Sequence, residues 1–354
     1  MLQTYAAQTA VEKMGYSVEI LDYVPEGLSF KRAVWPKDNT AFLIKTLKLL
    51  PLIICNAVQF RIVNKFIIDY IKISERRYKS YSEILRCVPD ADVYLSGSDQ
   101  IWNTQNNNPP EDIKAYYLSF VPPGKRKVAY AGSFGKTVFS ENETHEIYER
   151  LSSYDALSVR EDTAVKTLED AGIYNVVHVV DPTLLLTPEE WMEFCVKKPP
   201  EPGYIFIYNL NRNKIIKELA RKISTEKKLR IVNFADTLEF IPHAENRIIN
   251  TALDFLNYII HADFVLTDSF HGAAFSLNFN KQFISVPAPK YNSRLESILR
   301  ITGLLESRYA DSVEKGMKAV NTEIDYRDIR KLLERERIKS QMYLKKALPG
   351  DNCE

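Results

Sequence analysis

An alternation of short apolar segments with helical segments, interrupted once and then resumed, constrains this chain more than any other feature. The interruption is VKKPPEPG, residues 196–203, whose proline and lysine content is typical of a linker. Strand–loop–helix alternation predicts parallel sheets covered by helices. We therefore predict an α/β fold with two Rossmann-like domains, residues 1–196 and 197–354, that face each other across a cleft.

The individual elements follow from the same pattern. A charged segment at about 325–347 carries apolar residues at helical spacing, and it predicts a terminal helix that crosses between the domains. The predicted strands are SVEILDYVP, DVYLSG, KRKVAYAG, ALSVRE and NVVHVVDPTLLL in the first domain, and YIFIYNL, LRIVNF and DFVLTD in the second. Helices are expected at 141–153, 162–171, 212–223 and 251–260, and from about 270.

Residues 31–79 form an unusual basic insertion in the first domain. They contain eleven Lys or Arg residues against three Asp or Glu, with long apolar stretches between them. The pattern predicts two or more amphipathic helices, broken near Pro51. These helices either cover the domain with their cations in water, or they contact an anionic membrane surface or a lipid-linked substrate.

Composition narrows the class of protein. Hydrophobic residues make up 45% and charged residues 26%, as in soluble globular proteins, and the net charge of +1 gives no reason to expect nucleic acid as a partner. The four cysteines lack metal-site or disulfide spacing, so we predict neither. We see no signal peptide and no run of about 18 uninterrupted apolar residues. We therefore expect a cytoplasmic protein, with peripheral contact at the inner membrane face as the open alternative.

The segment FVLTDSFHG, residues 264–272, is the strongest candidate site. A buried strand ends at Asp268 and Ser269, which can cap a helix that starts with Phe270, His271 and Gly272. A helix N-terminus favours an anion, and His271 adds a group that exchanges protons near neutral pH. The other four histidines are expected to be structural or on the surface.

Three further segments follow strands and so belong to the same edge of the fold. Arg160 in LSVRE has a planar fork that binds carboxylate or phosphate; the alternative is an ion pair with Glu161 or Asp162. Lys290 and Arg294 would add positive charge to the same cleft. In LSGSDQIWN, Trp102 offers a flat face for a sugar ring, with Asp99, Gln100 and Asn103 to bind hydroxyls. A core tryptophan in a loop is the alternative.

Taken in order, GSDQIWN, AYAGSFG, SVRE, VDPTLLL and TDSFHGAAFSL resemble the polysaccharide pyruvyltransferase family. The similarity runs from the first residues to about residue 300, and GSDQIWN and TDSFHG are its specific parts. It implies a GT-B-like fold with the site between two domains. It also implies phosphoenolpyruvate as donor, no other cofactor, and a glycan acceptor, often lipid-linked, that receives a cyclic pyruvate ketal.

The resemblance also implies roles for individual residues. Arg160 and His271 match the family's donor-site arginine and histidine, and Lys290 matches a basic residue that some members carry. Ser269 and Gly272 at the helix start would complete the donor site. Asp99, Gln100, Trp102 and Asn103 would orient the acceptor sugar, in a pathway for surface or capsular polysaccharide.

One departure from the family concerns the first residues. Relatives usually begin with a strand and a G-N-x-G loop before an L-Q-x-Y-A helix, whereas here Met1 directly precedes Leu2. We therefore expect that the first strand and glycine loop are missing from residues 1–196, through a late start or a truncation that impairs activity. Two alternatives remain: a GT-B-type glycosyltransferase, and a catalytically impaired glycan-binding or assembly protein.

Overall fold

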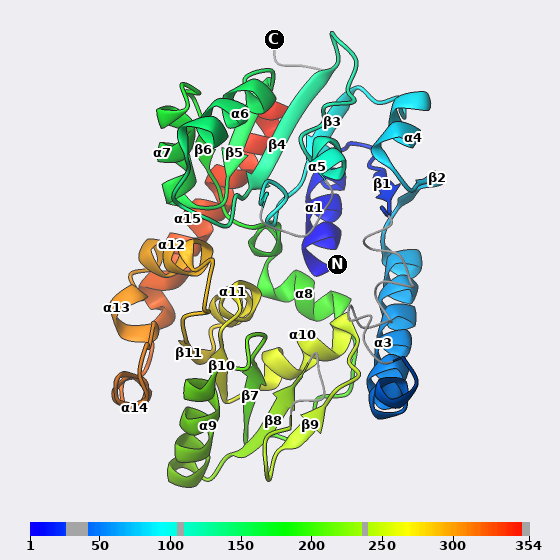
Figure 1. The fold of residues 1–354 in the computed structure, drawn as a ribbon. Helices are drawn as coiled ribbons and strands as arrows, with labels where there is room; N and C mark the ends of the chain where they lie inside the picture. The colour runs from blue at the N-terminus through cyan, green and yellow to red at the C-terminus, as the bar shows by residue number, and fades with distance from the viewer. Residues whose placement is uncertain (26–41, 105–109, 236–239, 349–354) are drawn as a thin grey trace.

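The computed structural model describes residues 1–25, 42–104, 110–235 and 240–348, and it describes only the backbone of residues 42–49 and 110. Two sets of parallel strands lie one above the other in Figure 1, with helices around both. The predicted α/β fold with two Rossmann-like domains is therefore confirmed. The domain boundary at residues 196–197 stays a prediction.

The sheet of the second half has the strand order β11-β10-β7-β8-β9 and is parallel throughout. Its central strands β7 and β10 are almost completely buried, because helices cover both faces. The elements of this half are β7 (Tyr204–Tyr208), α9 (Lys214–Lys227), β8 (Arg230–Phe234), β9 (Glu245–Arg247), α10 (Ala252–His261), β10 (Phe264–Thr267), α11 (Phe270–Asn278), β11 (Gln282–Ser285), α12 (Ser293–Ile301), α13 (Leu305–Arg308) and α14 (Val313–Val320).

The strands of the first half form two separate parallel sheets, β3-β4-β5-β6 and the pair β1-β2. The elements are α1 (Leu2–Glu12), β1 (Ile20–Tyr23), β2 (Ile73–Tyr78), α4 (Tyr81–Arg86), β3 (Val93–Ser96), α5 (Pro110–Tyr116), β4 (Arg126–Gly132), α6 (Glu141–Leu151), β5 (Ala156–Val159), α7 (Asp162–Asp170), β6 (Val177–His178), the 3-10 helix η2 (Pro182–Leu184) and α8 (Pro188–Phe194).

The last strand of the first half is much shorter than predicted. The segment NVVHVVDPTLLL was expected to be one strand, yet only Val177 and His178 pair in the sheet. The chain then turns into η2, because the Asp181 carboxylate accepts hydrogen bonds from the backbone N–H of Thr183 at 3.0 Å and from its hydroxyl at 2.8 Å. This turn aims Asp181 toward the other half of the molecule.

The basic insertion differs from its prediction in two ways. A single helix, α3 (Phe42–Tyr70), runs through Pro51 without a break, and residues 73–78 form strand β2 rather than helix. Residues 31–41 of the insertion lie outside the described residues. In Figure 1, α3 runs along one side of the lower sheet.

The described part of α3 is a candidate for a membrane-spanning helix. Leu50–Tyr70 is long and apolar enough to cross a bilayer by length and composition alone, with a mean hydropathy of 1.3, and only 6% of it is buried. The sequence-based expectation of no transmembrane segment required an uninterrupted apolar run, and Arg61, Lys65 and Asp69 interrupt this one. A single helix of this kind is weak evidence for a span, since core helices and signal sequences share these properties.

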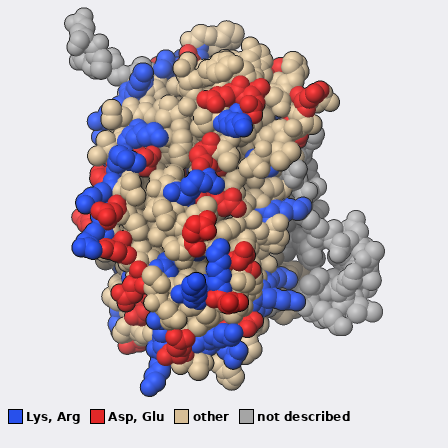
Figure 2. All heavy atoms as spheres, turned by 90° about the vertical axis from the view of Figure 1, so that its left-hand side faces the viewer, with Lys and Arg blue, Asp and Glu red and all other residues tan. Residues whose placement is uncertain are grey.

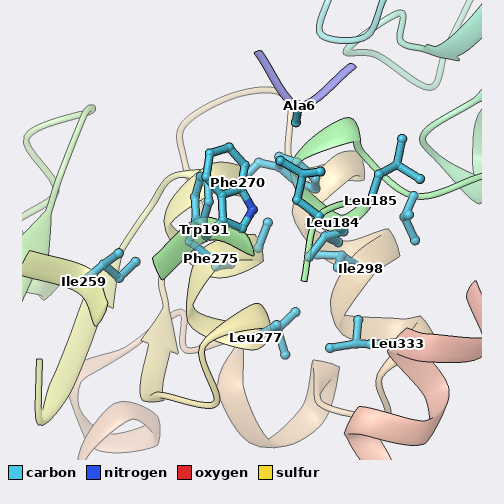
Figure 3. Packing of buried hydrophobic residues seen from close by; sticks show 14 of the residues in the cluster. Ala6, Leu184, Leu185, Trp191, Ile259, Phe270, Phe275, Leu277, Ile298 and Leu333 are labelled. Atoms are coloured by element: carbon cyan, nitrogen blue, oxygen red, sulfur yellow. The ribbon is translucent and has the colours of Figure 1, made fainter. Parts of the chain in front are cut away.

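One hydrophobic core joins the two halves. Figure 3 shows side chains from α1, η2, α8, α10, α11, α12 and α15 (Tyr326–Ala347) packed together, with Trp191, Phe270 and Phe275 among them. Helix α15 contacts both halves, because the Tyr343 hydroxyl donates to the Ala129 carbonyl at 2.7 Å while Tyr326 bonds to Lys281. The predicted crossing helix is confirmed.

Surface charges are mixed on the face that Figure 2 presents, which is the left-hand side of Figure 1. Lys and Arg side chains lie beside Asp and Glu across this face. Close pairs of opposite charge among the described residues include Arg300 with Asp162 and Lys331 with Asp328. The net charge of +1 follows from nearly equal numbers of basic and acidic residues, 47 Lys or Arg against 46 Asp or Glu.

Candidate active site

His271 stands at the junction of β10 and α11, as the sequence predicts. Ser269 occupies the N-cap position, but its side chain makes no capping hydrogen bond. The Asp268 carboxylate accepts instead from the backbone N–H groups of Leu210 and Asn211, at 2.7 and 2.9 Å. The prediction of side-chain capping was therefore wrong, because the loop after β7 binds Asp268 first.

Gly272 is required for the close packing of α11 on β10. A Cβ atom built at this position would collide with the side chain of Thr267. The Thr267 hydroxyl also accepts from the backbone N–H of Ser269 at 3.0 Å. Absence of a side chain at Gly272 thus brings the start of the helix against the end of the strand, which fixes the position of His271.

Arg160 follows β5 and lies in the interior, with its side chain only 1% exposed. Its guanidinium donates to Asp181 at 2.5 Å and to Asp99 at 3.2 Å, and it stacks over the ring of Phe270 at 4.6 Å. Arg160 therefore pairs with residues distant in sequence, and not with its neighbours Glu161 or Asp162, which were the alternative partners. Glu161 accepts instead from Ser133, and Asp162 pairs with Arg300.

Asp99 lies between two arginines in a backbone conformation that side chains rarely adopt, with φ at 76°. Its Oδ1 accepts from Arg160 and, at 3.0 Å, from Arg294. Burial opposes ionisation, but Arg160, His271 and Arg294 together hold the pKa of Asp99 well below its usual value. The side chain is nevertheless 51% exposed, so the ionised carboxylate faces open space.

Asp181 is the functional candidate that the sequence reasoning missed. Its carboxylate is completely buried and accepts from Arg160 and, at 3.0 Å, from the Ser98 hydroxyl. Burial raises the pKa of this carboxyl, yet Arg160 and His271 outweigh burial and leave the pKa below its usual value. The only available signal was its place in VDPTLLL, where an aspartate before proline most often serves as a cap.

His271 completes the cluster from the second half of the molecule. Its Nε2 lies 3.9 Å from Asp181 Oδ1, beyond hydrogen-bond reach, and makes no hydrogen bond to any residue that the structure describes. Burial lowers the pKa of His271, Asp181 and Asp99 oppose the change, and Arg160 and Arg294 add to it; the net effect leaves the pKa below its ordinary value. The imidazole is therefore mainly neutral at neutral pH.

A first cavity, which we call the α11 cavity, opens between the carboxyl ends of the strands of both halves. Its volume is about 530 Å³. Asp99 and Gln100 come from the first half, and His271, Lys290 and Arg294 from the second. The start of α11 at Ser269 also lies on its wall, so cations and a helix N-terminus meet in one space.

A second cavity, which we call the α3 cavity, lies on another side of His271. Its volume is about 310 Å³, and α3 forms one of its walls. Asp99 and His271 line both cavities. The two spaces therefore meet at these residues.

Two of the four predicted sugar-binding residues, Trp102 and Asn103, do not line either cavity. Trp102 is 1% exposed, stacks on Tyr117 with ring centres 5.8 Å apart, and leaves no room for a side chain at Gly132. Its prediction as a sugar platform was wrong, because the loop folds back on β4. Asn103 is also buried and donates to Gln100 at 3.1 Å, so it supports the loop rather than lining either cavity.

The remaining histidines have the structural or surface positions that the sequence predicts. His178 lies with its Nε2 3.1 Å from the Arg160 carbonyl, and His261 with its Nδ1 2.8 Å from the Asn257 carbonyl. His145 and His243 are exposed. Among the described residues, no group of three His, Cys, Asp or Glu side chains is placed to hold a metal ion.

Comparisons with solved structures show the fold. The UDP-GlcNAc 2-epimerase from Neisseria meningitidis, solved with UDP-GlcNAc bound, matches with a TM-score of 0.51 and 9% identity over 98% of this chain and 95% of that one. The UDP-GlcNAc 2-epimerase from Methanocaldococcus jannaschii matches with a TM-score of 0.50 and 15% identity over 96% of both chains. These likenesses support a GT-B-like arrangement of two Rossmann-like domains.

Comparison at the level of sequence gives the family. No curated protein shows a significant match. The model of the polysaccharide pyruvyl transferase family matches residues 1–288, which include every residue of the site cluster except Arg294 and the loop beyond Ala288. This match covers most of the chain, and the chain therefore belongs to the polysaccharide pyruvyl transferase family.

Proposed function

We propose that this protein transfers the pyruvyl group of phosphoenolpyruvate to two hydroxyls of a glycan, as a cyclic ketal, in the synthesis of a surface or capsular polysaccharide. Membership of the family supports this activity. The observation that carries the proposal is the position of His271, at a helix N-terminus beside two arginines and on the wall of a cation-lined cavity.

The α11 cavity suits a donor with two anionic groups. Phosphoenolpyruvate carries a carboxylate and a phosphate, and the cavity presents Lys290, Arg294 and the start of α11 at Ser269 and Gly272. Lys290 is exposed in the loop after β11, so it can reach over the opening. The cavity thus has charge of the sign the donor requires on several of its walls.

Asp99 gives Arg160 a specific role in this proposal. The Asp99 carboxylate is half exposed and occupies the position between Arg160 and Arg294 where an anionic donor group would bind. We infer that the donor carboxylate takes the place of Asp99 beside these two arginines. Arg160 would keep its pair with buried Asp181, which holds the guanidinium in position.

The proposed reaction balances without another cofactor. A proton adds to the methylene carbon of phosphoenolpyruvate, which becomes a methyl group, and the first sugar hydroxyl adds to C2 and loses its proton. The second hydroxyl then adds to C2 as the C–O bond to phosphate breaks, and its proton leaves with the phosphate or with a base. The products are one cyclic ketal and one inorganic phosphate.

His271 can assist at two points of this sequence. A neutral imidazole accepts a proton from an attacking hydroxyl and returns it to the methylene carbon; general acid–base catalysis of this kind contributes about 10²–10⁴-fold. It can alternatively donate a hydrogen bond to the departing phosphate at the start of α11. The low pKa of His271 favours the proton-accepting role.

The experiment that tests the function measures phosphate release from phosphoenolpyruvate in the presence of a panel of glycosides, with mass spectrometry of the products. Pyruvyl transfer requires phosphate release that depends on the glycoside, and a product that carries the ketal. Absence of both with every glycoside, while a nucleotide sugar is consumed, would favour a glycosyltransferase. Saccharide binding without any turnover would favour the glycan-binding alternative.

We also propose that α3 holds the enzyme at an anionic membrane surface, at the cytoplasmic face where lipid-linked glycans are assembled. Leu50, Ile54, Arg61, Lys65 and Ile68 recur at helical spacing and are exposed, so apolar and cationic groups share the outward face. An interfacial helix needs this combination of groups. The inward face packs on the protein through Phe66, which supports a helix that lies along the surface.

A further inference from the structure

We propose that the α3 cavity is the binding site for the acceptor saccharide, and that α3 forms part of it. This inference rests on the proposed function, because it names the second substrate of the same site. The sequence motifs assigned the acceptor to the loop Asp99–Asn103. This inference places it instead in the α3 cavity. Helix α3 would then have a role in recognition as well as at the membrane.

The lining of the α3 cavity has the chemistry that binds sugars. Tyr208 at the carboxyl end of β7 is half-buried and supplies a flat apolar face, whereas Phe234 and Phe255 in the lining are only 3% and 9% exposed. The side-chain amide of Asn56 lines the wall that α3 contributes. An aromatic face beside an amide that can bond hydroxyls favours an uncharged saccharide over an anion.

The position of the cavity suits the reaction geometry. Asp99 and His271 line both cavities, so a saccharide in the α3 cavity and a donor in the α11 cavity meet at His271. The imidazole Nε2 is buried and has no hydrogen-bond partner among the described residues. The attacking hydroxyls would thus arrive beside the neutral base.

One residue of the cavity lining carries an unsatisfied buried polar atom. Asn250 lines it, and the side-chain oxygen of Asn250 is buried and accepts no hydrogen bond from any described residue. A buried acceptor of this kind costs about 1–3 kcal/mol unless a partner supplies a donor. A saccharide hydroxyl is a donor of the size that the cavity admits.

A pair of hydrogen bonds fixes α3 to the opposite wall. The Gln59 amide donates to the Asn250 carbonyl at 2.9 Å, and its oxygen accepts from the Asn250 backbone N–H at 3.3 Å. The two residues are far apart in sequence, so this contact holds the insertion against the loop before α10. The α3 wall is therefore held in a defined position beside the site.

The first test fills the cavity from α3. Asn56→Trp places a large side chain in the cavity, whereas Met342→Trp adds the same side chain at an exposed position of α15 and serves as the matched control. With a glycoside that supports turnover, we expect Asn56→Trp to raise the acceptor KM about tenfold or more, which corresponds to ~1.4 kcal/mol. The KM for phosphoenolpyruvate and all constants of Met342→Trp should stay near those of the wild type.

The second test uses the cysteine that lines the cavity. N-ethylmaleimide should label Cys55, and the p-nitrophenyl glycosides of a hexose panel should slow that labelling while exposed Cys87 reacts at an unchanged rate. Phosphoenolpyruvate alone should not protect Cys55. Peptide mass spectrometry of the full-length protein gives both rates from one sample.

The outcomes separate this inference from the proposed function. If the wild type turns over and Asn56→Trp keeps a normal acceptor KM, or if phosphoenolpyruvate rather than the glycoside protects Cys55, the acceptor site lies elsewhere and the function stands. If glycosides protect Cys55 but no phosphate is released, the cavity binds saccharides as inferred, and the proposed pyruvyl transfer is contradicted. If a glycoside supports turnover but leaves Cys55 labelling unchanged, the inference is overturned.

Discussion

At the scale of single residues, the candidate site is a set of charges that pair with one another. Arg160 and Asp181 are buried together, and Asp99 closes the set from the open side. Removal of one member of a buried pair leaves the other charge without a partner, which commonly costs 3–5 kcal/mol. Substitutions here therefore test stability and function at the same time.

Arg160→Ala should abolish transfer and lower the midpoint of thermal unfolding, because Asp181 would remain buried without its ion-pair partner. Arg160→Lys keeps the charge, but a lysine ammonium lacks the planar fork that spans Asp181 and Asp99. We expect the lysine variant to fold and to bind phosphoenolpyruvate at least about tenfold more weakly. Calorimetric titration and thermal unfolding measure the two effects, and donor affinity equal to that of the wild type would refute the role of the fork.

His271→Ala should lower kcat by about 10²–10⁴-fold with little change in donor affinity if the imidazole transfers protons. A role in binding phosphate predicts the reverse, with loss of affinity as the main effect. His243→Ala, at an exposed position, is the matched control. Full activity of His271→Ala would remove this residue from the site.

The pH profile distinguishes a base from an acid at His271. Its pKa is lowered from the ordinary value of an imidazole, so the neutral base persists at neutral pH and is lost only as the pH falls through the lowered pKa. We therefore expect kcat to stay level from pH 8 to about 6.5 and to fall at lower pH. A rate that rises as the pH falls would show that the protonated imidazole is the active form.

At the scale of elements, α3 is the most unusual feature of the molecule. Its described outward face carries both exposed apolar side chains and cations, while its inward face contributes to a cavity. The helix continues through Pro51 although proline has no N–H and therefore removes one backbone hydrogen bond inside the helix. The proposed membrane contact and the proposed acceptor site therefore lie on opposite faces of one helix.

The double variant Ile54→Glu and Ile68→Glu should reduce binding to vesicles that contain anionic lipid by about tenfold or more, because two apolar contacts are lost and two negative charges are added. Ile338→Glu, at an exposed position of α15, should bind as the wild type does. Co-sedimentation at low and high salt measures both. If the wild type does not sediment with anionic vesicles even at low salt, α3 serves only to cover the domain.

At the scale of the whole molecule, α15 connects the two halves whose facing edges form the site. Arg337 on this helix donates to the Leu184 carbonyl at 2.7 Å and to the Asn278 side chain at 3.1 Å, which belong to the first and second halves. The candidate site requires a fixed position of one half relative to the other, because Arg160 belongs to the first half and His271 to the second. Helix α15 therefore supports the geometry of the site from a distance.

Arg337→Ala should lower the free energy of unfolding by about 2–4 kcal/mol, because the carbonyl of Leu184 and the side chain of Asn278 would lose a charged donor in the interior. Arg335→Ala, which removes an arginine that is 70% exposed on the same helix, should change it by less than about 0.5 kcal/mol. Urea unfolding measures both. Equal effects of the two substitutions would mean that Arg337 does not link the halves.

The sequence by itself determined the α/β class, the two-domain rhythm and the strand-to-helix junction at His271. These features depend on local periodicity and on residues close together along the chain. Local signals also predicted the terminal helix, because apolar residues at helical spacing mark the buried face of a helix wherever it packs. They failed for Trp102 and for the strand at residues 175–186, where tertiary contacts with β4 and a side-chain cap at Asp181 overrode the pattern.

Only the tertiary structure decided which charges meet. Arg160 pairs with Asp181 and Asp99, and not with its neighbours Glu161 and Asp162. The reason is that side chains next to each other at the end of a strand point in different directions. The α3 cavity likewise has walls from residues 52–59, 208–235 and 250–275, which no local pattern relates to one another. Proximity between distant segments is a property of the packed chain, so the partner of each site residue and the second cavity could be found only in three dimensions.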